Sequence, residues 1–314
     1  MHYYGLSILR GVAAFFIVGC HLGLAPRTMR GEMVTWLCDM NVGLFAAISG
    51  FLMSDQGEQI GRYVRKRAGR LLPAYVVWSI VYIVATAVFD LLLDGGRLNE
   101  RYYSLSNWMQ ILLGGGAAAH LWFLICLLYG QIAIKVLMAI TEKVRLPLVG
   151  QRLLFLLVSV FLLWCSFTWA NWYCIYPARL VSFLLLGNVL KASGKTGLAL
   201  PLMGVIVMMA FHIGMREVLP GFLRDYLTVI PLIILFASGK FHESKIATVL
   251  GATSFGVYLV HPLFARGVSF VFAKFAAIPY NASTVLVVWL LVWVMSQWLV
   301  VLLKKMPIVW RFMR

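Results

Sequence analysis

Long apolar stretches, repeated along the whole chain, constrain the fold of this sequence more than any other feature. A helix needs roughly 20 apolar residues to cross a hydrocarbon core of about 30 Å, and windows of low charge approach that length throughout the sequence. Hydrophobic residues make up 62% of the 314 residues and charged residues only 12%. No stretch shows the sustained polar and apolar alternation of a membrane barrel strand. The sequence therefore predicts an all-α fold, a polytopic membrane helical bundle.

We expect about ten transmembrane helices from the apolar windows. They lie near residues 7–24, 35–53, 71–91, 119–140, 153–170, 178–191, 198–214, 225–238, 246–272 and 283–303. A short half-helix at Trp108–Leu113 is expected before the fourth. No basic cluster precedes the first apolar run, so no cleavable signal is expected. The longest polar stretch, Ser54–Arg70, is too short for a soluble domain, and residues 1–314 are expected to form a single transmembrane domain with no appended soluble domain.

The distribution of lysine and arginine indicates the orientation. With a cytoplasmic N-terminus, roughly sixteen of the basic residues fall in inner segments and about eight in outer segments. Both termini are therefore predicted to be cytoplasmic. The formal net charge of +16 is then mostly a topology signal with attraction for anionic lipid, and it does not indicate a nucleic-acid partner. The five cysteines show no CxxC spacing and are interpreted as apolar filler rather than metal ligands.

The first apolar span carries Arg10 and, eleven residues later, His21. Eleven residues of α-helix rotate by about 1100° and rise about 16 Å, so the two side chains share one face. Because a charge inside the membrane is costly, an aligned pair of this kind is predicted to face the bundle interior or a water-filled cavity. The alternative is that Arg10 reaches the inner headgroups and His21 bonds a backbone carbonyl.

A basic cluster precedes the third span, with five cationic residues in the nine positions from Arg62 to Arg70. If the segment is helical, Arg62, Lys66 and Arg70 lie on one side, with Arg67 beside Arg70. Arginine forks suit the bidentate binding of phosphates, and a cluster at the inner surface would suit several of them. The alternative is a lipid-binding patch that stops translocation.

Three further motifs lie within or beside the spans. Ser49 and Gly50 end the second span, and small residues there allow a helix or a ligand to approach the backbone closely. His120, in HLWFL, and His261, in YLVHPL, stand near the outer ends of their spans. Pro262 is predicted to kink the helix beside His261. Each histidine alone favours a structural role over a catalytic one, since imidazole hydrogen bonds join helices in membranes.

Together these stretches resemble acyltransferase family 3, a family of integral-membrane acyltransferases. The resemblance rests on motifs in the family's order that cover nearly the whole chain: Arg10 with ten residues before His21, Gly43–Phe51 ending in Ser-Gly-Phe, Lys66-Arg67-x-x-Arg70-Leu-x-Pro73-x-Tyr75, His120-Leu-Trp-Phe-Leu, Tyr258-Leu-x-His261-Pro, and a basic tail with Pro307. The second motif departs from the pattern, because Phe45 is followed by Ala46 instead of a second aromatic residue and Gly43 replaces an Asp or Pro. These departures concern the substrate pocket and not the class.

The resemblance implies transfer of an acyl group, most often acetyl, from a cytoplasmic acyl-CoA to a hydroxyl of a glycan or glycolipid at the outer face of the bacterial cytoplasmic (inner) membrane. His21 would be the general base, since a neutral imidazole suits proton transfer at physiological pH, and Asp39 its carboxylate partner. The cluster of Arg62, Lys66, Arg67 and Arg70 would bind the donor's phosphates. The pantetheine arm would run along a single cavity from Arg10 to His21.

Other roles stay open at this stage. Ser49 would either donate a hydrogen bond to the thioester carbonyl or permit close packing. His120, Trp122, Tyr258 and His261 would contact the acceptor or be structural. The outer aromatic residues stack on sugar rings or form an interfacial belt; they are Trp108, Trp122, Trp169, Trp172, Tyr173 and Tyr176.

The donor would be acetyl-CoA or another short acyl-CoA, without a metal, and transfer would proceed either directly or through an acyl-histidine. The rival functions are a transporter or flippase of a small metabolite or lipid-linked sugar and a structural subunit of an envelope complex. We find no convincing internal repeat of the kind that a transporter of inverted topology would show.

Overall fold

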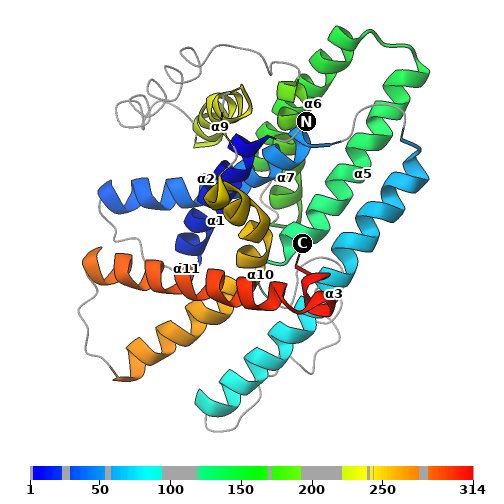
Figure 1. Cartoon of the computed structure of the whole chain (residues 1–314). Coiled ribbons are helices and arrows are strands. Elements are labelled where there is room, and N and C mark those ends of the chain that lie inside the picture. The colour runs from blue at the N-terminus through cyan, green and yellow to red at the C-terminus, as the bar shows by residue number, and fades with distance from the viewer. Residues whose placement is uncertain are drawn as a thin grey trace.

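The computed structural model describes residues 3–22, 29–53, 58–93, 118, 120–168, 172–191, 221–238, 241–242, 244–275 and 282–313. Over these ranges the chain is helical, without a strand (Figure 1). The helices are α1 (Tyr4–Cys20), α2 (Met29–Phe51), α3 (Ile60–Leu93), α5 (Trp122–Lys143), α6 (Leu148–Thr168), α7 (Trp172–Leu190), α9 (Gly221–Ser238), α10 (Lys245–Phe275), α11 (Ala282–Lys304) and α12 (Pro307–Trp310). The predicted all-α class is thus confirmed for the described part of the chain.

Five of the described helices are long and apolar enough to cross a membrane: α3, α5, α6, α10 and α11. Shorter apolar helices lie within α1, α2, α7 and α9. Each predicted span coincides with one of these helices except 198–214, which lies outside the described residues, as does the half-helix predicted at Trp108–Leu113. The chain is therefore a multi-pass membrane protein, while the number of crossings and the orientation of the termini stay predictions.

Helix α1 lies inside the bundle, in contact with α2, α9, α10 and α11. Its side chains Leu6, Leu9 and Ile17 are buried against these neighbours. The outward faces of α3, α6 and α11 instead carry exposed large apolar side chains, among them Trp164 and Trp298. Such faces suit lipid rather than water. The arrangement places the polar residues of α1 between other helices.

Helices α2 and α7 approach each other closely through glycine. A Cβ atom at Gly50 would stand 1.9 Å from the carbonyl oxygen of Leu184, and one at Gly187 would stand 1.8 Å from that of Ala47. Only a residue without a side chain fits at either position. Of the two roles that the sequence allows for the Ser-Gly pair, close helix packing is the one that Gly50 fulfils.

Hydrogen bonds and ion pairs tie the outer helices to the centre. The Tyr82 hydroxyl on α3 donates to the carbonyl oxygen of Leu259 on α10 at 2.6 Å, and Arg266 on α10 pairs with Asp90 on α3 at 3.2 Å. Helix α10 continues through Pro262, and Figure 1 shows it changing direction between its gold and orange parts. A bend is expected where a proline removes a backbone donor.

Candidate active site

A cavity of about 370 Å³ opens between α1, α2, α3, α5 and α10. We call it the basic cavity because cationic side chains from two helices meet in it. Its lining consists of Arg10, Phe45, Ile48, Ser49, Leu52, Lys66, Arg67, Arg70, Leu71, Phe123, Leu127, Gln131 and Phe255. Arg10 comes from α1 and the other three cations from α3, so the fold joins two motifs that are far apart in the sequence.

Arg10 points into the basic cavity and not toward lipid. Its guanidinium carbon stands 5.9 Å from the centroid of the Phe45 ring, and its charge is close enough to that of Arg70 for the two to repel each other. Two like charges held together in a partly dry space favour an anionic ligand, because the repulsion is relieved when a negative group binds between them.

The predicted phosphate cluster is divided between two places. Lys66, Arg67 and Arg70 line the basic cavity. Arg62 lies with Arg65 and Lys66 in a separate, exposed hollow of about 600 Å³. Of the cluster, Lys66 therefore borders both spaces, whereas Arg62 is not part of the cavity's described lining.

Three residues in or beside the basic cavity carry no role in the sequence analysis. The Tyr63 ring lies between the guanidinium carbon of Arg67, at 5.2 Å from its centroid, and the ammonium nitrogen of Lys135, at 5.9 Å. Lys135 is only 3% exposed. Oε1 of Gln131 is buried and has no hydrogen-bond partner in the described part of the chain. The signal that could have found them is spacing, since Tyr63 and Arg67, and Gln131 and Lys135, are four residues apart on a helix.

Three histidines from distant parts of the chain form a second group, here called the histidine cluster. The ring centroids of His21 and His261 are 4.8 Å apart, those of His120 and His261 5.7 Å, and those of His21 and His120 6.0 Å. His21 caps the end of α1 and is exposed, whereas His120 and His261 are buried. Within the described ranges, no three His, Cys, Asp or Glu side chains are arranged to hold a metal ion.

Backbone carbonyls fix the protonation of two of these rings. Nδ1 of His21 lies 3.1 Å from the carbonyl oxygen of Ile17, and Nδ1 of His261 lies 3.1 Å from that of Val257. A carbonyl only accepts, so each Nδ1 carries the hydrogen and the neutral ring has its lone pair on Nε2. Nε2 of His120 and of His261 is buried and has no hydrogen-bond partner among the described residues. The cluster therefore combines two buried imidazoles with the exposed ring of His21.

Asp39, the predicted carboxylate partner of His21, lies on α2, but its side chain falls outside the described residues. The carbonyl of Ile17 orients the His21 ring and selects its tautomer, and the pairing of Asp39 with His21 stays a prediction. The last carbonyls of a helix lack intrahelical partners, so the carbonyl four residues before His21 is free to accept from its ring.

Aromatic side chains separate the basic cavity from the histidine cluster. The ring of Tyr258 lies 6.5 Å from Phe45 and 5.3 Å from Phe123 on one side, and 5.5 Å from His120 and 6.2 Å from His261 on the other, between centroids. The Tyr258 hydroxyl donates to the carbonyl oxygen of His120. We call Phe45, Phe123 and Tyr258 the aromatic layer.

The aromatic layer corrects one expectation. A single cavity from Arg10 to His21 is predicted from the sequence, yet the basic cavity is lined by Arg10 and does not reach His21. The reason is packing, since the large rings of Phe45, Phe123 and Tyr258 contact one another there. The two residues lie at the two sides of one layer of side chains.

The remaining predicted site residues lie as follows. The Ser49 hydroxyl lines the basic cavity and donates to the carbonyl oxygen of Phe45 at 2.9 Å. Trp122 packs against Tyr176, with 4.9 Å between ring centroids, in a separate pocket. Trp108 and Trp169 lie outside the described residues, as do the side chains of Trp172 and Tyr173.

Comparison with known proteins identifies the family. The family model described as "Acyltransferase domain" matches residues 3–303. Neither the curated proteins nor the solved structures contain a match. The match covers both the basic cavity and the histidine cluster, together with every motif on which the resemblance rests except the basic tail with Pro307. The chain therefore belongs to acyltransferase family 3 and is a membrane acyltransferase.

Proposed function

We propose that the protein transfers an acyl group, acetyl first among the candidates, from acyl-CoA in the basic cavity to a hydroxyl of a glycan or glycolipid at the outer face of the bacterial cytoplasmic membrane. One observation carries the proposal: Arg10 lines the cavity that also contains the α3 cations, and the same helix ends at His21 in the histidine cluster. About 16 Å of helix separates the two residues. A donor with a charged head and a long, slender arm matches that separation.

The basic cavity supports the donor's identity. Coenzyme A carries a pyrophosphate and a ribose phosphate, and Arg10, Arg67 and Arg70 offer planar forks that pair bidentately with phosphate oxygens. The volume of about 370 Å³ lies within the usual range of about 300–1,000 Å³ for small-molecule pockets. Gln131, with its unpartnered buried Oε1, offers an acceptor to an amide N–H of the pantetheine arm.

The histidine cluster supports the chemistry. The acceptor oxygen forms a bond to the thioester carbonyl carbon while its proton passes to Nε2 of His21. The carbon–sulfur bond then breaks, and the proton passes on to the departing thiolate. The buried Nε2 lone pair of His261 stabilises the imidazolium that exists between these steps. General-base catalysis of this kind contributes about 10²–10⁴-fold.

The aromatic layer sets the order of events. With Phe45, Phe123 and Tyr258 in contact, the basic cavity is closed toward His21. Donor binding moves these rings apart and admits the thioester to the cluster. Before the donor binds, the layer keeps the basic cavity apart from the histidine cluster.

The experiment is thiol release from acetyl-CoA by the purified protein in nanodiscs, with a panel of glycan acceptors. A transporter or a structural subunit would release no thiol. In the variant His21→Asn, the side-chain amide still donates to the Ile17 carbonyl, but it has no basic nitrogen. We expect acceptor-dependent thiol release to disappear with this variant while the affinity for acetyl-CoA is kept. Full activity of His21→Asn would remove His21 from the mechanism. The exposed His242, outside both groups of site residues, provides the matched control His242→Asn.

A further inference from the structure

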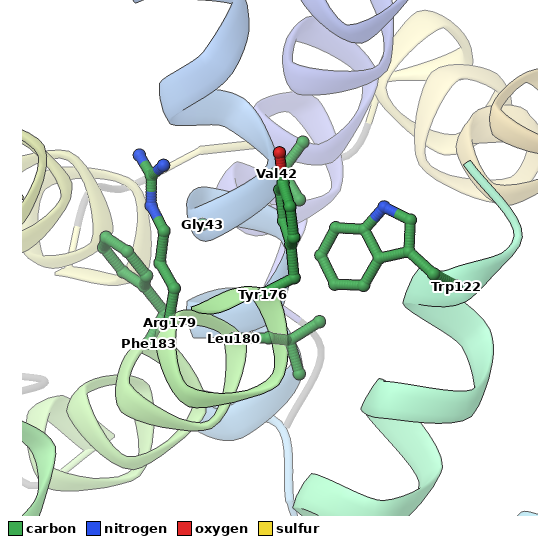
Figure 2. A pocket seen from close by; sticks show the side chains of 7 residues that line it. All are labelled: Val42, Gly43, Trp122, Tyr176, Arg179, Leu180 and Phe183. Carbon is green, nitrogen blue, oxygen red and sulfur yellow. The ribbon is translucent and has the colours of Figure 1, made fainter. Parts of the chain in front are cut away.

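A second pocket, of about 140 Å³, lies between α2, α5 and α7, apart from the basic cavity. Figure 2 shows the Tyr176 ring standing between the indole of Trp122 and the side chain of Arg179. The lining is completed by Val42, Gly43, Leu180 and Phe183. The proposed function gives this pocket no task. We call it the Trp122–Tyr176 pocket.

The wall of this pocket consists of two half-exposed aromatic rings. The centroids of Trp122 and Tyr176 are 4.9 Å apart, and their planes are inclined by 54°, so the two rings meet at an angle and form a concave corner. Aromatic faces are electron-rich and attract the positive edges of C–H groups. The C–H faces of a pyranose ring fit such a corner.

The polar part of the pocket is a charge-balanced pair. Arg179 forms an ion pair with Asp225 of α9, whose side chain is 5% exposed. The guanidinium thus keeps N–H donors for the pocket, while its positive charge is already matched by the buried carboxylate. Such a pair suits hydroxyl groups. A carboxylate or phosphate ligand would instead compete with Asp225 for the same guanidinium.

The pocket lies toward the histidine end of the bundle. On α5, Trp122 precedes Gln131 of the basic cavity by nine residues, or about 13 Å of helix, and on α2, Gly43 precedes Ser49 by about 9 Å. Trp122 follows closely after His120 in the chain and packs against Phe123 of the aromatic layer, with 6.1 Å between ring centroids. The pocket is therefore near the reacting groups but has none of the three histidines in its described lining, which suits a sugar that neighbours the one being acylated.

We propose that the Trp122–Tyr176 pocket is a subsite for an uncharged sugar ring of the acceptor glycan. That the bound sugar belongs to the acceptor rests on the proposed function. That the pocket binds a sugar rests on the pocket alone. It makes the protein selective for an acceptor of at least two sugar units: one held here by its C–H face and hydroxyl groups, and the next presented to His21.

The test is saturation-transfer NMR on the full chain in nanodiscs, which detects weak binding. The probes are the methyl glycosides of glucose, galactose and mannose, with methyl glucuronide as the charged counterpart. We expect saturation of the ring C–H protons of at least one uncharged glycoside, a several-fold loss of that signal in Trp122→Ala and Tyr176→Ala, and retention of it in Tyr176→Phe. Trp298→Ala, at a 65% exposed tryptophan on α11, is the matched control and should bind as the wild type does. Acetyl-CoA should not displace the glycoside.

The proposal is overturned if no uncharged glycoside receives saturation, if Trp122→Ala and Trp298→Ala bind alike, or if the glucuronide binds best. Thermal unfolding of each variant separates loss of binding from loss of folding, and Tyr176→Phe keeps the test decisive if an alanine variant does not fold. Thiol release is an independent readout. Glycoside binding without thiol release from any acceptor would leave the sugar pocket standing and refute the transfer. His21-dependent thiol release with unchanged glycoside binding in Trp122→Ala would support the transfer and refute the sugar pocket.

Discussion

The imidazole rings of His21 and His261 stand 4.8 Å apart, one at the end of α1 and the other in the middle of α10, and each donates its Nδ1 hydrogen to a carbonyl four residues earlier. The two rings are thus held in the same tautomer by their own helices. A proton taken up by His21 has a basic nitrogen close by, which makes His261 more than a packing residue in the account given above.

The variant His261→Asn separates these two roles. Its side-chain amide preserves the donor to Val257, so folding should be kept, but it lacks the Nε2 lone pair. We expect kcat to fall about 10–100-fold, within the range of general acid–base effects, with the KM for the acyl donor unchanged. The measurement is the rate of thiol release against acetyl-CoA concentration. An unaltered kcat would show that His261 serves packing alone.

Arg67 and Arg62 provide a matched pair, since both lie on α3 but only Arg67 lines the basic cavity. Loss of a charge-assisted hydrogen bond costs about 1.5–3 kcal/mol. Arg67→Ala should therefore weaken the binding of coenzyme A at least about tenfold, whereas Arg62→Ala should change it little. Isothermal titration of the protein in nanodiscs measures both constants. Equal effects would indicate that the donor phosphates bind in the exposed hollow instead.

Lys135 tests whether the positive charge behind Tyr63 acts on the donor. Lys135→Met removes the charge of a buried side chain, and the loss of one member of a buried interaction destabilises a protein, so thermal unfolding of the variant is measured alongside binding. The affinity for coenzyme A should fall several-fold, because a positive charge 5.9 Å from the Tyr63 ring is lost beside the cavity. A lower midpoint with unchanged affinity would make Lys135 a purely structural residue.

Alanine substitutions at Gly50 and at Gly69 should have opposite effects on stability. At Gly50 an alanine Cβ would meet the Leu184 carbonyl at 1.9 Å, whereas nothing lies within 4 Å of a Cβ at Gly69. Gly50→Ala should force α2 and α7 apart and lower the unfolding temperature markedly. Gly69→Ala should raise helix stability by about 0.5–1 kcal/mol. Thermal unfolding of the two variants in the same detergent compares them, and a stable Gly50→Ala protein would contradict the close approach.

The spans and the two principal motifs could be predicted because they depend on local properties. Apolar windows of helical length locate the helices, and the spacing of Arg10 and His21 places both on one face of α1. The meeting of Arg10 with Lys66, Arg67 and Arg70 was expected only through the family resemblance, since spacing within one helix says nothing of another helix.

The histidine cluster and the aromatic layer depend on tertiary packing, which no local pattern encodes. His21, His120 and His261 belong to three segments that the sequence gives no reason to join, and each alone has a structural interpretation. Phe45, Phe123 and Tyr258 look like ordinary core residues in their own helices. That they form one layer between Arg10 and His21 follows from how α2, α5 and α10 pack. This is why a continuous cavity was expected, whereas the lining of the basic cavity does not include His21.

The most direct test of the central claim is a cryo-EM structure of the protein in nanodiscs with a non-hydrolysable acetyl-CoA analogue. The account predicts the pyrophosphate between Arg10, Arg67 and Arg70, the aromatic layer parted, and the acyl carbonyl within about 4 Å of Nε2 of His21, the reach of a near-attack arrangement. Phosphates bound away from the basic cavity, or an acyl group held on its near side with Phe45, Phe123 and Tyr258 still in contact, would contradict it.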